Sequence, residues 1–484
     1  MSSETKKGGI GAFDFFCIGF GAIVGVGWAL SVNRWMANSG GALPASMGYI
    51  FCLIIMVPVA LCYCELVPMM PVAGGGAAFA YKAFGQNVSF ISGWAAFGGF
   101  VTIVPWEAIY VCDIASILFP VLKSGEPLYV IADSGVYIGH IILGTVFSLL
   151  LFYANWRGLV TSAFVQRILT IILIGCGLLA MIVALTKFDP INFQPLYENI
   201  GRGSHHSFFG GMMAIMMTAP FFLAGFETIP QGVEDASGTV TSVGKTVVLS
   251  VSCACLFYAL MLFSMGGAYH WQDFWANGTF GSPAAGLLML KIFPGGEGTT
   301  LYFILLIGAI CGMLTTWNGF FLASPRLLMG MARANMIPKV FAKQHPVSKT
   351  PTVGLTFVLV LSLLGPFLGM GLVDPLTSFA GAGFVLSWAI TSFCVVKLRK
   401  SMPDAERPYK IPGGSATAWF AGIVMSIFFV CFFIPGTPVF LESMAIILFI
   451  AWMVVGGALY FGSASQRNAI PVEQRVAALF DPKK

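Results

Sequence analysis

Charged residues are scarce in this 484-residue chain, because Asp, Glu, Lys and Arg together make up only 9% of it. A soluble domain usually carries about 25%. Hydrophobic residues make up 57%, so the composition excludes a soluble globular protein and indicates that a lipid bilayer is the solvent. The net charge of +5 is small, and the basic residues lie in short connections between apolar segments. This pattern gives no support for nucleic acid as a partner.

A metal-binding or disulfide pattern is also lacking. All 11 cysteines lie inside apolar segments, where a thiol behaves as a small hydrophobic side chain. The two Cys-x-Cys pairs, Cys62 with Cys64 and Cys253 with Cys255, have no matching histidine. We therefore expect no metal cofactor and no redox function. No nucleophile, base and orienting group stand together at membrane depth, so we expect no enzymatic activity.

Long apolar segments, in contrast, are abundant. A helix needs about 20 apolar residues to cross the hydrocarbon core, and this rule predicts an all-α membrane protein with twelve transmembrane helices. They lie near residues 13–37, 42–67, 90–119, 136–154, 159–185, 208–230, 243–269, 300–328, 353–372, 376–395, 419–434 and 439–460. A further apolar segment at 282–292 is too short to cross. The domain of twelve helices then covers 13–462, between polar tails at 1–12 and 463–484.

The basic residues are distributed unequally between the two sides of such a bundle. With twelve spans, 20 of the 25 Lys and Arg residues fall on the side that holds both termini. Loops rich in Lys and Arg stay in the cytoplasm. We therefore expect a multi-pass protein of the plasma (inner) membrane with both termini cytoplasmic. A wrong number of spans would have mixed the two sides, so the asymmetry also favours twelve.

Two of the predicted spans contain residues that interrupt a helix. The first span has three glycines within the segment Gly21–Gly27, and the sixth has Gly225 between Pro220 and Pro230. Small residues can simply allow close helix packing, but paired breaks also mark the midplane binding site of a transporter. Helix N-termini there would supply N–H donors for a carboxylate, and freed carbonyls would receive an ammonium group. The breaks therefore predict a small zwitterionic or amine substrate.

Short motifs follow one another in order along almost the whole chain. They are the glycines at 21–27, Glu65-Leu66 with 71–75 and Tyr81, the segment 155–158, the segment 225–227, the segment 326–338 and the segment 397–412. With these motifs the chain resembles the amino acid–polyamine–organocation superfamily. The resemblance implies a LeuT-like inverted repeat of five plus five helices, at about 13–185 and 208–395, with two appended helices at about 419–460.

The resemblance also implies the place of the substrate, between the first and sixth spans. Backbone N–H groups of Gly25 and Gly27 would bind its carboxylate. Phe221 would act as a lid, with ordinary core packing as the alternative. The expected substrate-binding residues are Ala22, Ile23, Gly25, Val26, Gly27, Glu107, Phe221, Ala224, Gly225, Phe226 and Glu227.

Two of these residues, Glu107 and Glu227, are acids inside predicted spans. Burying a bare carboxylate in a membrane is costly, so such a residue usually has a function. Glu227 lies beside the break of the sixth span. Glu107 has two open roles, which are recognition of a substrate ammonium group and a structural pair with a basic or hydroxyl partner.

The sequence departs from proton-coupled relatives in its fifth span. Many of them carry a lysine three residues after the Thr of a Gln-x-x-x-Thr element. This chain has Gln166 and Thr170, but Leu173 stands at the lysine position. The usual reason to expect lysine-based proton coupling is therefore absent.

The eighth span resembles the sodium-binding element of sodium-coupled relatives. Gly312 is followed by the hydroxyl residues Thr315 and Thr316, and Na⁺ prefers oxygen ligands such as hydroxyls and freed carbonyls. A sodium site would combine these three residues with the carbonyls of Gly21 and Val24. Alternatively, both hydroxyls bond back to carbonyls one turn earlier in their own helix. Proton symport and sodium-independent exchange also stay open.

These observations together predict a secondary transporter that moves small amino acids by alternating access. A transporter or exchanger of amines or polyamines is the alternative, with Glu107 and Glu227 as cation partners. A nutrient sensor with this fold would be expected to carry a large soluble extension. The sequence contains no ring of charged residues and no filter segment, so it does not indicate an ion channel. Beyond the substrate and the bilayer no partner is predicted, and the oligomeric state is left open.

Overall fold

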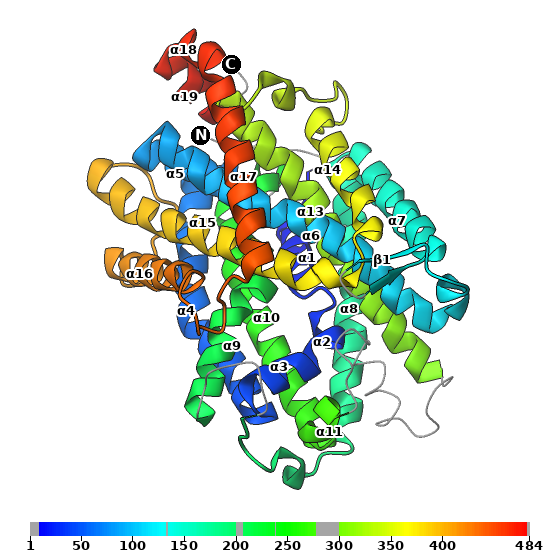
Figure 1. Cartoon of the computed structure of the whole chain (residues 1–484). Helices are drawn as coiled ribbons and strands as arrows, with labels where there is room; N and C mark the ends of the chain where they lie inside the picture. The colour runs from blue at the N-terminus through cyan, green and yellow to red at the C-terminus, as the bar shows by residue number, and fades with distance from the viewer. Residues whose placement is uncertain (1–8, 132–133, 200–206, 238, 277–299, 482–484) are drawn as a thin grey trace.

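The computed structural model describes residues 9–131, 134–199, 207–237, 239–276 and 300–481. These residues form a bundle of α-helices (Figure 1). In the described part, the one β-hairpin pairs β1 (Tyr129–Ile131) with β2 (Ser134–Val136), and Tyr129 lies opposite Val136. The structure thus agrees with an all-α membrane protein. The short apolar segment predicted at 282–292 lies outside the described residues.

Nine helical segments of the described chain are long and apolar enough to cross a membrane. They are α4 (Ala42–Met69), α6 (Gln86–Leu118), α7 (Ile138–Trp156), α8 (Leu159–Leu185), α9 with η3 (Phe208–Asp235), α10 (Val240–Ala268), α13 (Thr300–Arg333), α15 (Val373–Ser401) and α17 (Ser443–Gly462). The other three predicted spans coincide with shorter apolar helices, α1 (Ala12–Ile23), α14 (Thr352–Leu364) and α16 (Ser415–Cys431). A helix therefore occupies each predicted span, and the number of membrane crossings stays a prediction.

Short elements connect these helices. They are α2 (Gly27–Leu30), α3 (Val32–Ser39), α5 (Gly75–Phe84), η1 (Pro120–Lys123), η2 (Pro190–Phe193), α11 (Trp271–Ala276), η4 (Lys339–Ala342), η5 (Gly365–Phe367) and η6 (Met370–Leu372). The described part of the predicted C-terminal tail folds into α18 (Ala464–Asn468) and α19 (Val472–Phe480).

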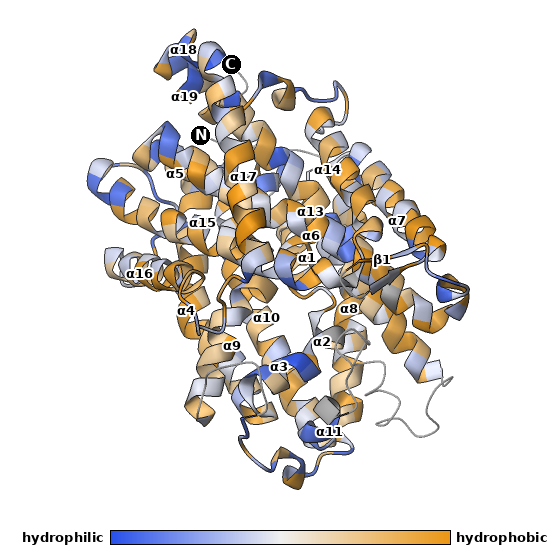
Figure 2. Ribbon diagram, in the orientation of Figure 1, coloured by the Kyte–Doolittle hydropathy of each residue, from blue (hydrophilic) through white to orange (hydrophobic). Residues whose placement is uncertain are grey.

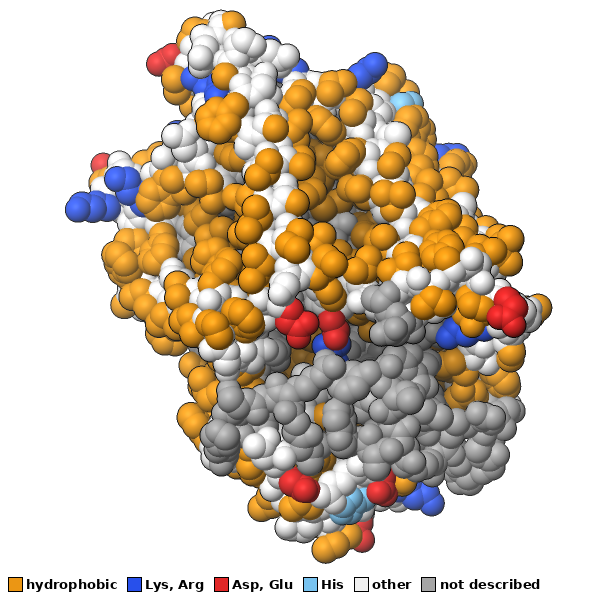
Figure 3. All heavy atoms as spheres, in the orientation of Figure 1, with side chains coloured by type: hydrophobic (Ala, Val, Ile, Leu, Met, Phe, Trp, Pro, Cys, Tyr) orange, Lys and Arg blue, Asp and Glu red, His pale blue; other side chains and the backbone are white. Residues whose placement is uncertain are grey.

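The helices differ in how much of their apolar surface is buried. The most apolar stretch of α17 is 11% buried, whereas that of α15 is 78% buried. Apolar residues colour the outer faces of the peripheral helices in Figure 2, and hydrophobic side chains cover most of the described part of the face in Figure 3. An apolar surface of this extent would be an aggregation hazard in water. It is the surface expected of helices that face lipid.

Helix α1 lies inside the bundle. It packs against α8, α10 and α13, and it also contacts η3 (Phe226–Asp235), the second half of the sixth predicted span. Around it, α4 runs along α10, while α6 packs against both α13 and α15. The two segments that the sequence marks as interrupted are therefore neighbours in the centre of the fold.

The start of α1 is joined to the end of η3. Ile10 forms an isolated parallel bridge with Ala236. The backbone N–H of Ile10 donates to the Asp235 carbonyl at 3.3 Å, and the Ile10 carbonyl accepts from the Ser237 N–H at 2.9 Å. The first and sixth predicted spans thus meet at this end of the bundle as well as at their breaks.

A buried acid ties α4 to the connection between α15 and α16. The Glu65 side chain, 1% exposed, accepts hydrogen bonds from Arg399 Nε at 2.9 Å and from Arg399 Nη2 at 2.6 Å. The backbone N–H of Ile411 also donates to it, at 3.0 Å, and Arg407 Nε lies 3.5 Å away. A bidentate arginine pair fixes geometry as well as charge. Motif residues 65 and 397–412 therefore meet in space.

We expect Arg399→Ala to destabilise the protein by roughly 3 kcal/mol, because it breaks a buried pair and leaves Glu65 with the more distant Arg407. Thermal unfolding of the purified protein in detergent would measure the effect. Lys400→Ala is the matched control, since Lys400 is the next residue of α15 and is exposed. Equal melting temperatures for the two variants would contradict a stabilising role for the pair.

Candidate functional site

The first interrupted segment lies between α1 and α2. Helix α1 ends at Ile23, and Val24 leaves the helical conformation with φ −86° and ψ 41°. The backbone N–H groups of Gly25 and Val26 make no hydrogen bond to any residue that the structure describes. The break thus leaves N–H donors free, and one of them, that of Gly25, is among the two that we expected to bind a carboxylate.

The second interrupted segment lies between α9 (Phe208–Leu223) and η3. Gly225 adopts φ +135°, and a Cβ added to it would lie 2.6 Å from the carbonyl carbon of Ala22 and 2.7 Å from the nitrogen of Ile23. Only glycine combines this backbone conformation with so close an approach of another backbone. The two breaks are therefore in direct contact.

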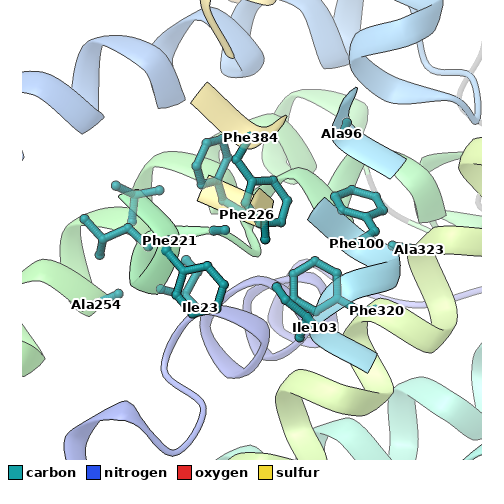
Figure 4. Close-up of a cluster of buried hydrophobic side chains, with 14 of the residues drawn as sticks. Ile23, Ala96, Phe100, Ile103, Phe221, Phe226, Ala254, Phe320, Ala323 and Phe384 are labelled. Atoms are coloured by element: carbon teal, nitrogen blue, oxygen red, sulfur yellow. The ribbon is translucent and has the colours of Figure 1, made fainter. Parts of the chain in front are cut away.

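A small cavity of about 30 Å³ lies beside the two breaks. That is room for a water molecule, so its walls must move apart to admit a larger ligand. It is lined by Ala22, Ile23, Gly25, Val26, Gly27, Ile103, Trp106, Glu107, Phe221, Phe222, Ala224, Tyr258 and Thr316. Eight of the eleven predicted substrate-binding residues are among them. Figure 4 shows the apolar side chains around the break of α1, with Ile23 and Phe221 on one side and Ile103 on the other.

The other three predicted residues, Gly225, Phe226 and Glu227, support the second break and do not line the cavity. Phe226 is buried between the rings of Tyr63 and Trp388, at centroid distances of 5.3 and 5.1 Å. Glu227 turns back along the chain, and its Oε2 accepts a hydrogen bond from the Gly225 N–H at 3.0 Å. This carboxylate thus satisfies a donor that the break has freed.

Four lining residues, Ile103, Trp106, Phe222 and Tyr258, were not predicted from the sequence. Tyr258 has a definite function there, because its hydroxyl donates to the carbonyl of Ile23, the last residue of α1, at 2.9 Å. Trp106 and Phe222 are sequence neighbours of predicted residues, and that adjacency was the available signal. No local pattern in α10 distinguishes Tyr258 from other buried aromatic residues.

Glu107 is the acid of the cavity wall. It is 2% exposed, and its Oε2 makes no hydrogen bond. Neither a basic nor a hydroxyl partner contacts it within the described ranges. A Cβ added to Gly25 would lie 3.5 Å from Glu107 Oε1, so the carboxyl group faces the break of α1. A buried carboxyl without a partner is costly, and the cavity is therefore suited to a ligand that brings a positive charge or a proton.

The residues expected at a sodium site are partly brought together. The Thr316 hydroxyl lies 3.3 Å from the Gly21 carbonyl and 3.4 Å from the Gly312 carbonyl. The Thr315 hydroxyl donates to the Gly312 carbonyl at 2.6 Å, which is the bond within its own helix that we considered as the alternative. Val24 lies at the end of α1, where its N–H donates to the Phe20 carbonyl at 2.8 Å.

Leu173, at the position where proton-coupled relatives carry lysine, is buried against the eighth span. A Cβ added to Gly312 would lie 3.1 Å from Leu173 Cδ1. Nearby, the Gln166 side-chain amide donates to the carbonyls of Cys17 and Thr315 at 3.3 and 3.0 Å. The Thr170 hydroxyl also donates to the Cys17 carbonyl, at 3.1 Å. The Gln-x-x-x-Thr element therefore fastens α8 to α1 and α13.

The amino acid permease family model matches residues 10–459. The chain belongs to this family of transport proteins, which confirms the resemblance drawn from its motifs. The branched-chain amino acid permease BcaP of Bacillus subtilis is 26% identical over 95% of this chain and 93% of its own length. The methylthioribose transporter of that organism is 23% identical over 95% of both chains. Its glutamate/serine transporter AimA is 24% identical over 86% of this chain and 76% of its own.

We expect Gly25→Ala to weaken amino acid binding by about tenfold or more. A Cβ there would lie 2.2 Å from the Thr316 hydroxyl and 3.5 Å from Glu107 Oε1, so it would distort the cavity wall.

Isothermal titration of the purified variants would measure these affinities. Gly457→Ala is the control, because a Cβ at Gly457 meets nothing within 4 Å. Wild-type affinity in a folded Gly25→Ala variant would show that this part of α1 does not form the binding site.

Proposed function

We propose that this protein is a secondary active transporter that carries small zwitterionic amino acids with apolar side chains across a membrane by alternating access. The cavity between the two broken helices carries the proposal. It combines free backbone N–H donors, an acid without a partner and an apolar wall. Paired broken helices at the membrane midplane are the usual setting of a transporter's substrate site.

The two ends of the zwitterion fit different parts of the cavity. The N–H groups of Gly25 and Val26 are available for the carboxylate, and the start of α2 adds the positive end of a helix dipole. Glu107 is available for the ammonium group. A charged partner would relieve the cost of burying this carboxyl. The substrate thus supplies the interactions that the protein leaves unmade.

The rest of the lining favours an apolar side chain. Ile23, Ile103, Phe221 and Phe222 present hydrocarbon to the cavity. A cationic side chain or a polyamine would need a second acid, and Glu227 does not line the cavity, since its Oε2 accepts from the Gly225 N–H at the second break. The relatives transport varied substrates, yet the branched-chain permease, at 26% identity, is of the class that this wall fits.

The same proposal includes the membrane arrangement. Twelve spans, with the first ten in two inverted repeats and both termini in the cytoplasm of a plasma-membrane protein, are supported by two observations. The breaks occur in the first and sixth spans, which correspond under a five-helix repeat, and 20 of 25 basic residues fall on one side.

We further propose sodium as the coupling ion, with proton symport through Glu107 and sodium-independent exchange as rivals. The Thr316 hydroxyl lies 3.3 Å from the Gly21 carbonyl and 3.4 Å from the Gly312 carbonyl. A hydroxyl that donates to a carbonyl, as Thr315 does, keeps lone pairs for a cation. The residues therefore fit a hard cation, and Leu173 offers no ammonium group in its place.

Uptake into proteoliposomes tests the coupling. With choline in place of Na⁺, at fixed pH and membrane potential, we expect leucine uptake to slow by about tenfold. Thr316→Ala should reduce the dependence on Na⁺, because it removes the hydroxyl that joins the two carbonyls. Uptake at the same rate in choline and in Na⁺ would exclude sodium coupling and leave exchange or proton symport.

A comparison of leucine with 3-methylbutylamine, its decarboxylated counterpart, tests the substrate class. We expect the wild type to bind leucine, and Glu107→Gln to weaken that binding by about tenfold, or 1.4 kcal/mol. If 3-methylbutylamine binds the wild type as tightly as leucine does, the amine alternative is correct. If neither ligand binds differently to the variant, Glu107 has a structural role.

A further inference from the structure

A second cavity lies at the far end of η3. It measures about 610 Å³, and it is lined by the end of η3, by α13 and by the segment after α4. Helix η3 begins at Phe226 beside the central cavity and ends at Asp235 in this second one. A 3₁₀-helix rises about 2 Å per residue, so η3 is about 18 Å long. The second cavity is lined by η3 from Gln231 onward.

Arg326 of α13 is the buried cation of this cavity. The residue is only 7% exposed. Its Nη1 donates to the Leu322 carbonyl, one turn earlier, at 2.9 Å. Within the described chain no carboxylate lies within salt-bridge distance of it. A guanidinium carries five N–H donors, so four of those of Arg326 have no hydrogen-bond partner among the described residues.

Asp235 supplies the complementary charge. It lines the same cavity, and its carboxylate makes no hydrogen bond or ion pair with the part of the chain that is described. It lies too far from Arg326 for a salt bridge, although the two charges interact through space. A cation and an anion therefore face the cavity separately, each without a direct partner.

The neighbouring charges do not take their place. Glu234 is already paired, since it accepts from Arg333 Nη1 at 2.7 Å and from the Ala73 N–H at 2.9 Å. Lys349 lines the cavity but is exposed, so water solvates it. Burial without a direct partner thus singles out Arg326, for which an uncompensated charge is expensive.

We propose that this cavity is a second binding site for the transported amino acid, in which Arg326 binds the carboxylate and Asp235 binds the ammonium group. The proposal rests on the proposed function of amino acid transport. Guanidinium and carboxylate match in a bidentate geometry. Because the cavity adjoins the basic end of the bundle, it lies on the cytoplasmic side in the proposed orientation, and the site receives the amino acid after it leaves the central cavity.

Kinetics from each face of oriented proteoliposomes test the site, with labelled leucine as the probe. For transport that starts from the cytoplasmic face, we expect Arg326→Gln to raise the half-saturating leucine concentration about tenfold. For transport that starts from the opposite face, the half-saturating leucine concentration should change by less than about twofold. Asp235→Asn should act in the same direction. Arg326→Lys keeps the charge but loses the bidentate geometry, so it should weaken affinity less than Arg326→Gln does. Lys349→Gln, at an exposed cation of the same cavity, is the control and should behave as wild type.

Equilibrium dialysis separates failure of this site from failure of the proposed function. We expect two leucine molecules per wild-type chain, with loss of one in Arg326→Gln and loss of the other in Gly25→Ala. One leucine per chain, unaffected by Arg326→Gln, would overturn the second site while leaving the central site intact. No leucine binding or uptake in the wild type would overturn the proposed function itself. Equal kinetic losses at both faces in Arg326→Gln would assign Arg326 a structural role.

Discussion

The contact between two interrupted helices is the constraint on which the rest of the structure depends. In a bilayer each backbone polar group needs a partner, so a helix can be broken only where protein surrounds it. Gly225 brings the second break against the backbone of Ala22 and Ile23 in the first. The surrounding helices α6, α8, α10 and α13 are arranged so that both breaks are enclosed.

Side chains from this surrounding shell satisfy some of the freed groups and leave others. Tyr258 bonds the Ile23 carbonyl, Thr316 approaches the Gly21 carbonyl, and Glu227 accepts from the Gly225 N–H. The N–H groups of Gly25 and Val26 are left, opposite the carboxyl group of Glu107. Selectivity then follows from the gaps in this arrangement, because a ligand gains most where it completes interactions that the protein lacks.

The sequence was most informative where a strong physical requirement leaves a local trace. The lengths of the apolar segments predicted a helix at every span, and the glycine and proline residues predicted both breaks. That Tyr258 and Phe222 line the cavity could not be predicted, because a buried aromatic residue gives the same sequence pattern in any helix of the bundle. The sequence also placed Glu227 in the cavity wall, whereas its carboxylate returns to its own backbone at Gly225. The direction in which a side chain points at a break depends on local dihedral angles, which composition does not encode.

The short pairing between Ile10 and the residues that follow η3 has a consequence for movement. It consists of a few backbone hydrogen bonds, each worth about 1 kcal/mol net, and it holds the beginning of the first span to the end of the sixth. If α1 tilts away at this end, the pairing must open first. If the pairing stays closed, the inner parts of both spans move as one body. Such a fastening is strong enough to favour one arrangement and weak enough to open and form again.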